Sequence, residues 1–191
     1  MKNFYGIILF MLFFIFSGCA SLLPSSEKDV KSPWSEFHEA KTSFDQIVPY
    51  KTTSAELKDL GFDPSETPNI GLLNYLDVVR RFMPNPNIKK NELDEGLLGC
   101  ISAKDGCRAY EVKLSKVSKK RFGNVLLDLF GFRRRTKIYG WEFDAIIVMN
   151  NDLVVYKIWG GRPKIDETTD EKKPLGPLQN SESILRRIVD L

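Results

Sequence analysis

The sequence predicts an α+β fold in which helices come first and an antiparallel sheet follows. Helix-capping residues and apolar residues at helical spacing occupy the first half of the chain, and the last such stretch covers residues 72–82. From residue 97 onward apolar and polar residues alternate, which is the period of a half-buried strand. A hairpin alone is marginal in water, so we expect the helices to cover one face of the sheet.

Two N-terminal helices are expected, over residues 32–45 and 53–60. In the second helix Thr53 and Glu56 form a capping box. The Thr53 hydroxyl can accept a hydrogen bond from the Glu56 N–H, and the Glu56 carboxylate can accept one from the Thr53 N–H. Gly61 follows and can take the left-handed conformation that ends many helices.

At least three antiparallel strands are predicted, over residues 110–114, 140–150 and 153–159. The last two are joined by an Asn-Asn-Asp turn, which is typical of a hairpin. Strict alternation places Val154 and Tyr156 on the same face of the final strand. The outer edge of that strand could accept a strand from a partner protein.

The beginning of the chain has the pattern of a bacterial lipoprotein signal. Lys2 is followed by an apolar run over residues 4–16, which is too short to span a bilayer of about 30 Å as a permanent helix. Two small residues then precede Cys19. We therefore expect residues 1–18 to be a signal peptide and Cys19 to carry the lipid anchor, with two or three acyl chains holding the protein stably. The alternative is a plain secretory signal with an accidental cysteine.

The rest of the chain divides by composition into three parts. Residues 19–32 are polar and are expected to form a tether without fixed structure, and residues 33–163 contain the predicted α+β domain. Residues 164–191 are charged and then Pro-rich, so we expect a strap that ends in a short helix over residues 181–189. The acidic residues at 166–171 are expected to be a solvated charge run.

Composition and cysteine usage narrow the class of protein. The chain is 42% hydrophobic and 28% charged, which suits a globular domain, and a net charge of +3 is too small to indicate a nucleic-acid partner. With Cys19 assigned to lipid, Cys100 and Cys107 remain, and an even pair in an oxidising compartment predicts a disulfide. A redox or metal pair is the alternative, but a metal needs more than two thiolates, and His38 is distant in sequence.

The residues give no catalytic constellation. His38 lies among charged residues of a predicted helix and is expected to be a solvated surface side chain. We therefore expect no enzyme activity, no metal and no cofactor. A carboxylate-based hydrolase acting on the cell wall is an alternative, although no pair of acids is singled out by the sequence.

A basic insertion over residues 113–137 carries nine basic residues and one acid. An apolar centre with cationic shoulders is typical of a segment at a lipid interface, so the insertion is a candidate contact for anionic headgroups or for a partner protein. Two alternatives are that its leucines pack on the sheet and that it docks an acidic protein. The candidate contact residues are Lys119, Lys120, Arg121, Phe130, Phe132, Arg133, Arg134, Arg135 and Lys137.

Residues 47–61, with the sequence IVPYKTTSAELKDLG, resemble the I-x-x-G-x-T-x-x-E-V-x-x-L-L-G segment of the SmpA/OmlA lipoproteins. Tyr50 stands where that family favours Gly. The family includes the small lipoprotein subunit of the outer-membrane β-barrel assembly machinery, so the resemblance implies two helices on a three-stranded antiparallel sheet and an envelope protein as partner. Ala20 follows the cysteine where Gram-negative lipoproteins of the inner membrane tend to have Asp, which implies the outer membrane.

Together these observations predict a lipid-anchored protein of the outer membrane, facing the periplasm, with a scaffold or accessory role in envelope assembly. An inhibitor-like or ligand-binding periplasmic module is the first alternative.

Overall fold

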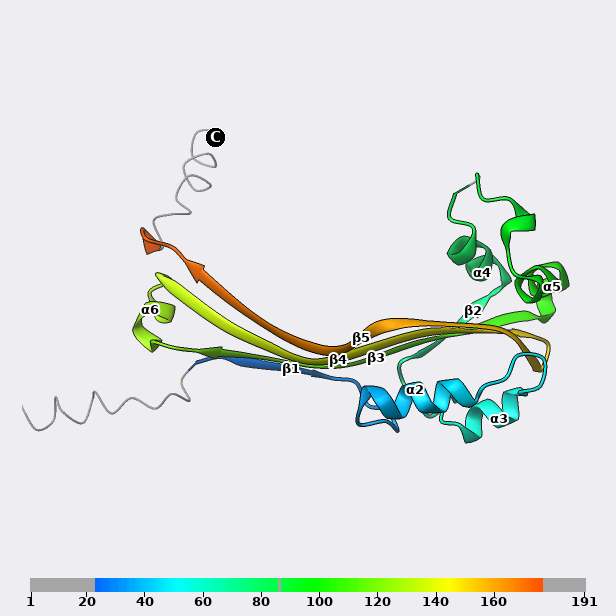
Figure 1. Ribbon diagram of the computed structural model, residues 1–191, viewed down its shortest axis with the longest axis horizontal. Coiled ribbons are helices and arrows are strands. Elements are labelled where there is room, and N and C mark those ends of the chain that lie inside the picture. Colours follow the sequence, from blue (N-terminus) through cyan, green and yellow to red (C-terminus); the bar gives the residue numbers. More distant parts are fainter. Residues whose placement is uncertain (1–22, 86, 177–191) are drawn as a thin grey trace, which may run out of the picture. The chain divides into compact units, whose positions relative to one another are not determined.

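The computed structural model describes residues 23–85 and 87–176, so Cys19, the signal peptide and the final predicted helix lie outside the described residues. The described elements are β1 (Ser25–Asp29), α2 (Phe37–Gln46), α3 (Ser54–Asp59), β2 (Ile70–Asn74), α4 (Tyr75–Phe82), α5 (Glu95–Ala103), β3 (Cys107–Phe122), α6 (Val125–Leu129), β4 (Arg133–Asn150) and β5 (Leu153–Lys172), with 3-10 turns at Lys90–Glu92 and Lys104–Gly106 (Figure 1).

The α+β class and the antiparallel sheet are confirmed. Five strands are hydrogen-bonded in the order β1-β3-β4-β5, and β2 pairs with β3 as well. β2 runs antiparallel to β3 with Ile70 opposite Val112 and Asn74 opposite Arg108. Long β3 therefore has two short strands on its outer edge.

The chain forms two compact units, which we describe separately. Among the described residues, unit 1 contains 23–27, 118–139 and 166–176, and unit 2 contains 28–117 and 140–165. Strands β1, β3, β4 and β5 contribute residues to both units.

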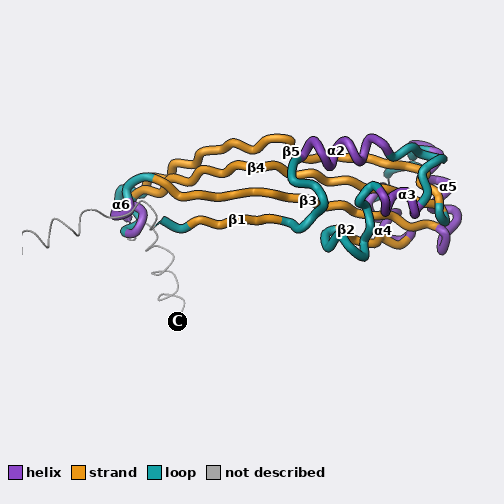
Figure 2. Tube along the Cα trace, turned by 90° about the horizontal axis from the view of Figure 1, so that it is seen from below, coloured by secondary structure: helices purple, strands orange, loops and turns teal. Residues whose placement is uncertain are grey.

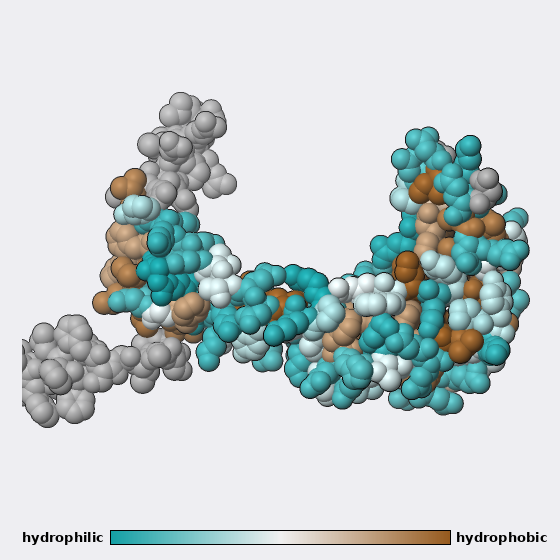
Figure 3. Space-filling view, in the orientation of Figure 1, coloured by the Kyte–Doolittle hydropathy of each residue, from teal (hydrophilic) through white to brown (hydrophobic). Residues whose placement is uncertain are grey.

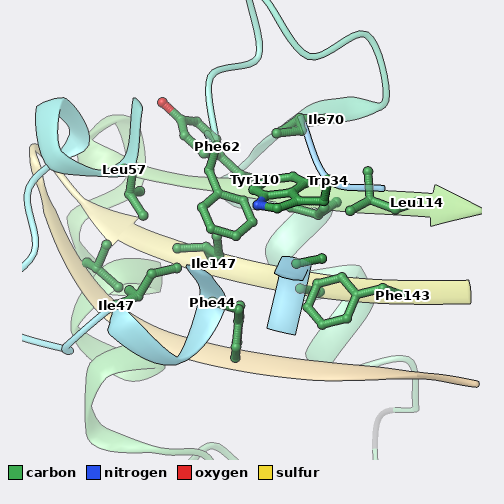
Figure 4. Packing of buried hydrophobic residues seen from close by; sticks show 14 of the residues in the cluster. Trp34, Phe44, Ile47, Leu57, Phe62, Ile70, Tyr110, Leu114, Phe143 and Ile147 are labelled. Atoms are coloured by element: carbon green, nitrogen blue, oxygen red, sulfur yellow. The ribbon is translucent and has the colours of Figure 1, made fainter. Parts of the chain in front are cut away.

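In unit 2 helices cover both faces of the sheet. Helices α2 and α3 lie on one face, and α4 and α5 lie on the other (Figure 1, Figure 2). On the first face, the rings of Trp34 and Phe62 are 4.8 Å apart and those of Phe44 and Phe143 are 5.9 Å apart (Figure 4). The predicted face of β4 is confirmed, because its alternate residues all contact this cluster: Trp141, Phe143, Ala145, Ile147 and Met149.

The opposite face of unit 2 holds a second buried cluster, so helices cover this face in addition to the one that the sequence predicted. Val78 of α4 and Leu97 of α5 pack there against Val148 of β4. The predicted disulfide between Cys100 and Cys107 lies in this cluster, with the two Cα atoms 4.7 Å apart. It joins α5 to the start of β3.

Helix α3 forms as predicted from its capping box. The Thr53 N–H donates to Glu56 Oε2 at 2.8 Å, and the Glu56 N–H donates to Thr53 Oγ1 at 3.3 Å. Gly61 has a φ of 94°, which lets the Phe62 N–H donate back to the Leu57 carbonyl oxygen at 2.8 Å. This closure turns the Phe62 ring into the core of unit 2.

The first predicted helix begins later than expected. Helix α2 starts at Phe37, and the Glu39 carboxylate caps it by accepting the Glu36 N–H at 3.3 Å. The Ser32 hydroxyl donates to the Trp34 carbonyl oxygen at 2.8 Å instead of capping a helix. Because Trp34 is buried and its indole N–H donates to Ser43 at 2.9 Å, residues 32–35 are an irregular segment packed on α2.

Two other segments also differ from the sequence prediction. Residues 72–82 are not one amphipathic stretch, because Ile70–Asn74 pairs with β3 before α4 begins. The Asn74 side chain caps α4 by accepting the Leu76 N–H at 2.9 Å. Residues 25–29 of the expected tether form β1, and residues 164–172 of the expected strap continue β5.

The alternation of side chains in β5 breaks near its start. Val154 belongs to the cluster under α2, whereas Val155 and Tyr156 both contact the opposite cluster. Lys157 is again on the α2 side, where its ammonium donates to the Phe44 carbonyl oxygen at 2.9 Å. Two consecutive residues on one face are typical of a β-bulge, so the prediction that Val154 and Tyr156 share a face is wrong.

The edge of β5 at Val154 is not free for a partner strand. The Tyr50 N–H donates to the Val154 carbonyl oxygen at 2.7 Å, and the Val154 N–H donates to the Thr52 carbonyl oxygen at 2.9 Å. Further along the same edge strand stands Pro163, which has no N–H to offer to a partner. These features argue against strand addition along this part of the edge.

Two glycines of α5 provide a matched test of this packing. A Cβ at position 96 would overlap the Val155 carbonyl oxygen of β5, whereas a Cβ at position 99 would meet no atom within 4 Å. We predict that Gly96→Ala lowers the free energy of unfolding by about 1–3 kcal/mol through overpacking. Gly99→Ala should raise it by about 0.5–1 kcal/mol through helix propensity.

Urea unfolding of the full chain and both variants measures the difference. Equal effects of the two substitutions would contradict the close approach of α5 to β5.

Candidate functional site

The candidate site is built around the short helix α6 in unit 1. The Asn124 side chain caps α6 by accepting the N–H groups of Leu126 and Leu127, at 2.9 and 3.2 Å. At the other end Gly131 has a φ of 71°, and the Phe132 N–H donates back to the Leu127 carbonyl oxygen at 2.8 Å. The local sequence therefore closes this helix within five residues.

A buried carboxylate fixes α6 to the strands on either side. The Asp128 side chain is only 5% exposed, and its Oδ1 lies 3.3 Å from Nη1 of Arg121 in β3. The same oxygen lies 3.6 Å from Nε of Arg134 in β4. Since breaking a buried ion pair leaves an uncompensated charge, this contact holds α6 in place.

With Asp128 facing inward, the apolar side chains around α6 face outward. Leu129 is 74% exposed and Phe130 is 56% exposed. Figure 3 shows hydrophobic side chains at the surface around α6, at the left of the view. We call the exposed apolar set the unit 1 patch, and it consists of Phe122, Leu126, Leu127, Leu129, Phe130, Phe132 and Leu175.

The turn after β5 supports one side of the unit 1 patch. The Lys173 N–H donates to the Phe132 carbonyl oxygen at 2.8 Å, and the Gly176 N–H donates to the Lys173 carbonyl oxygen at 2.9 Å. Gly176 lies against the Phe132 ring, where a Cβ would be 2.9 Å from Cε1. Leu126, Leu127 and Leu129 are exposed, so the alternative that the leucines of the basic insertion pack on the sheet is wrong for these three.

Most of the predicted basic residues are used in ion pairs within unit 1. Arg133 donates to Asp170 through Nε at 2.9 Å and Nη2 at 2.6 Å, and Arg135 Nε lies 3.6 Å from the same carboxylate. Lys137 Nζ lies 3.6 Å from Asp166. The acidic run at 166–171 is thus not merely solvated, because β5 aligns two of its acids with the arginines and lysine of β4.

Two predicted cations remain available at the surface. Lys119 and Lys120 are exposed near the end of β3, and neither forms an ion pair within the part of the chain that the structure describes. Over its described residues, unit 1 carries nine basic and six acidic side chains. The unit 1 patch is therefore flanked by net positive charge.

The other predicted residues do not join this site. The Cys100–Cys107 disulfide is in unit 2, and His38 is exposed on α2. No helix in residues 23–85 or 87–176 is long and apolar enough to span a membrane. The same residues contain no group of three or more His, Cys, Asp or Glu side chains that could hold a metal ion.

A pocket in unit 2 was not anticipated from the sequence. It has a volume of about 460 Å³ and lies between α3, β2, β3 and the β4–β5 turn. Burial raises the pKa of Tyr110 in its wall, with Asp63 and Asp152 acting in the same direction. The Ser65 N–H holds the pKa of Asp63 below its ordinary value. The wall of the pocket combines residues of β2 with the loop over residues 63–65. No sequence motif predicts that these two segments lie side by side.

Comparison with known proteins finds no matching family model, no matching curated protein and no matching solved structure. The resemblance to the SmpA/OmlA lipoproteins therefore stays a prediction.

The Arg133–Asp170 pair predicts a dependence of stability on pH. The hydrogen bonds from Arg133 lower the pKa of Asp170 from 3.8 to about 2. A carboxyl group whose pKa is depressed in the folded state stabilises the protein above its unfolded pKa, and this contribution disappears as the pH falls from about 3.8 to about 2. We expect the free energy of unfolding of the wild type to fall more steeply over this range than that of Asp170→Asn.

Urea unfolding at a series of pH values measures both slopes. Parallel curves for the two proteins would contradict the assignment of this titration to Asp170.

Proposed function

We propose that this chain is a lipid-anchored envelope protein with a non-catalytic scaffold or accessory role. The observation that carries the proposal is the leader, in which a short apolar run and two small residues end at Cys19. In this proposal the Cys19 lipid holds the protein in the outer membrane, and the domain faces the periplasm.

The disulfide supports an envelope location. Cys100 and Cys107 are both almost fully buried and are bonded to each other. Disulfides persist in the periplasm and are rare in the reducing cytosol. The disulfide between α5 and β3 therefore supports export of the chain from the cytosol.

A binding role is supported by the surface of unit 1. An exposed apolar patch rimmed by charged side chains is characteristic of a surface that meets a membrane or another protein. The SmpA/OmlA resemblance names an envelope assembly protein as the class of partner. The depressed pKa of Asp63 makes this carboxyl of the unit 2 pocket a poor general acid.

A ligand-binding module is the second candidate, and the pocket of about 460 Å³ in unit 2 is the observation that favours it. Its wall includes the cations Lys58 and Arg108 and the acid Asp152, whose carboxylate accepts a hydrogen bond from Ser54. The two candidates differ in one property. Binding of a small ligand in this pocket would survive removal of the lipid anchor, whereas a scaffold role at the membrane would not.

The first test of the proposed function concerns Cys19. We predict that the chain incorporates radioactive palmitate in cells and loses its leader, and that Cys19→Ala abolishes both changes. Ser21→Ala is the matched control because it alters a nearby small polar residue. An unlabelled wild type with an uncut leader, or equal labelling of Cys19→Ala, would overturn the proposal.

A second test concerns the disulfide. We predict that the protein isolated from envelopes without reductant resists thiol alkylation after unfolding. The double variant Cys100→Ala with Cys107→Ala should lose about 2.5 kcal/mol of unfolding free energy, by the loop-closure relation for a short loop. Free thiols in the isolated wild type would argue against an oxidising compartment.

A further inference from the structure

We propose that the unit 1 patch enters the headgroup region of an anionic bilayer, in the same membrane that holds the Cys19 lipid. This inference rests on the proposed function for the lipid itself. It adds a second, protein-mediated membrane contact with named residues. Three properties favour this contact: the short length of chain between the lipid and the patch, the rigidity of the patch, and the charge around it.

The chain between the proposed lipid and the unit 1 patch is short. The Arg121 N–H donates to the Pro24 carbonyl oxygen at 3.3 Å, which places Pro24 beside Phe122, the first residue of the unit 1 patch. Cys19 lies five residues before Pro24, and five residues span at most about 18 Å when fully extended. A free tether over residues 20–31 would have allowed about 40 Å. The pairing of β1 with β3 therefore keeps unit 1 close to the lipid.

The unit 1 patch is held rigidly. The Asn124 cap, the Gly131 turn and the buried Asp128 carboxylate fix both ends of α6 and its inward side. The exposed leucines and phenylalanines cannot turn inward, because Asp128 occupies the inner position between Arg121 and Arg134. A preorganised apolar surface loses little conformational entropy when it binds. The exposed side chains can therefore leave water by entering lipid, whereas burial inside unit 1 is blocked.

Basic side chains flank the unit 1 patch. Lys119 and Lys120 are exposed and form no ion pair within the described residues. Basic side chains beside an apolar patch are attracted to anionic headgroups, and salt screens that attraction within a Debye length. The paired residues Arg133, Arg135 and Lys137 contribute less, since Asp170 and Asp166 offset two of their three charges.

An acidic protein could also meet a positively charged apolar surface. The chain length favours the bilayer, because a lipid within about 18 Å of Pro24 brings unit 1 to a membrane surface before any partner is bound. This upper limit keeps Pro24 within reach of the headgroup layer, which is several ångströms thick.

The test uses the full mature, lipidated protein in vesicles that contain anionic lipid and bromine-labelled lipid. Leu129→Trp places a fluorescent reporter at a site that is 74% exposed in unit 1, while the native Trp34, Trp141 and Trp159 are all in unit 2. Leu72→Trp is the matched control, because Leu72 is 66% exposed and belongs to unit 2.

We expect Leu129→Trp to gain emission that is blue-shifted and lost in brominated vesicles, with a larger fractional loss than the wild type or Leu72→Trp shows. Adding Lys119→Glu and Lys120→Glu to Leu129→Trp should reduce that loss at low salt. Circular dichroism of each variant confirms that the fold is retained.

A Leu129→Trp protein that carries palmitate but is quenched no more than the wild type would overturn this inference and leave the proposed function standing. Absence of palmitate would overturn the proposed function itself. If a photo-crosslinker at position 129 captures a polypeptide in intact envelopes while Leu129→Trp stays unquenched in vesicles, the unit 1 patch docks a protein and the bilayer contact is rejected.

Discussion

The pairing along the outer edge of β3 is the constraint on which the rest of the structure depends. β3 is sixteen residues long, and an unpaired edge of that length would be open to unwanted association. Two short strands cover it: β2 pairs with residues 108–112, and the chain around β1 bonds to Ser115 and Arg121. All five side chains of β1 are exposed, so its backbone hydrogen bonds, and not burial, hold it in place. This pairing decides where the N-terminal segment leaves the domain.

The two units differ in whether their apolar residues are buried or exposed. In unit 2, helices on both faces of the sheet bury aromatic and aliphatic side chains in two clusters, and the disulfide braces one of them. In unit 1, a five-residue helix is too short to cover the strands, and its one buried side chain is the acid Asp128. The leucines around it are left at the surface for that reason. The proposed membrane contact rests on this exposed apolar surface and on the short length of chain between Cys19 and Pro24.

Local signals in the sequence were sufficient where the structure is local. The Thr53–Glu56 capping box, the alternation in β4 and the Cys100–Cys107 pair could all be predicted from neighbouring residues. The sequence of β1, Ser-Ser-Glu-Lys-Asp, has no alternation of apolar and polar residues. In β2, the apolar residue Leu72 is 66% exposed. Neither strand therefore has the sequence pattern of a half-buried strand. Both form because β3 offers them an edge. The Arg133–Asp170 pair likewise depends on the register of β4 with β5, which distant residues determine.

The order of residues 25–29 is the most direct test of this account, because the position of the proposed anchor depends on it. Hydrogen exchange of the lipidated protein in vesicles, followed for the backbone amides of β1 and β3, makes the measurement. We expect the β1 amides that face β3, and the Arg121 amide, to exchange much more slowly than those of an unstructured peptide. Exchange of residues 25–29 at the rate of an unstructured chain would contradict it, since the lipid would then be attached through a long, free tether.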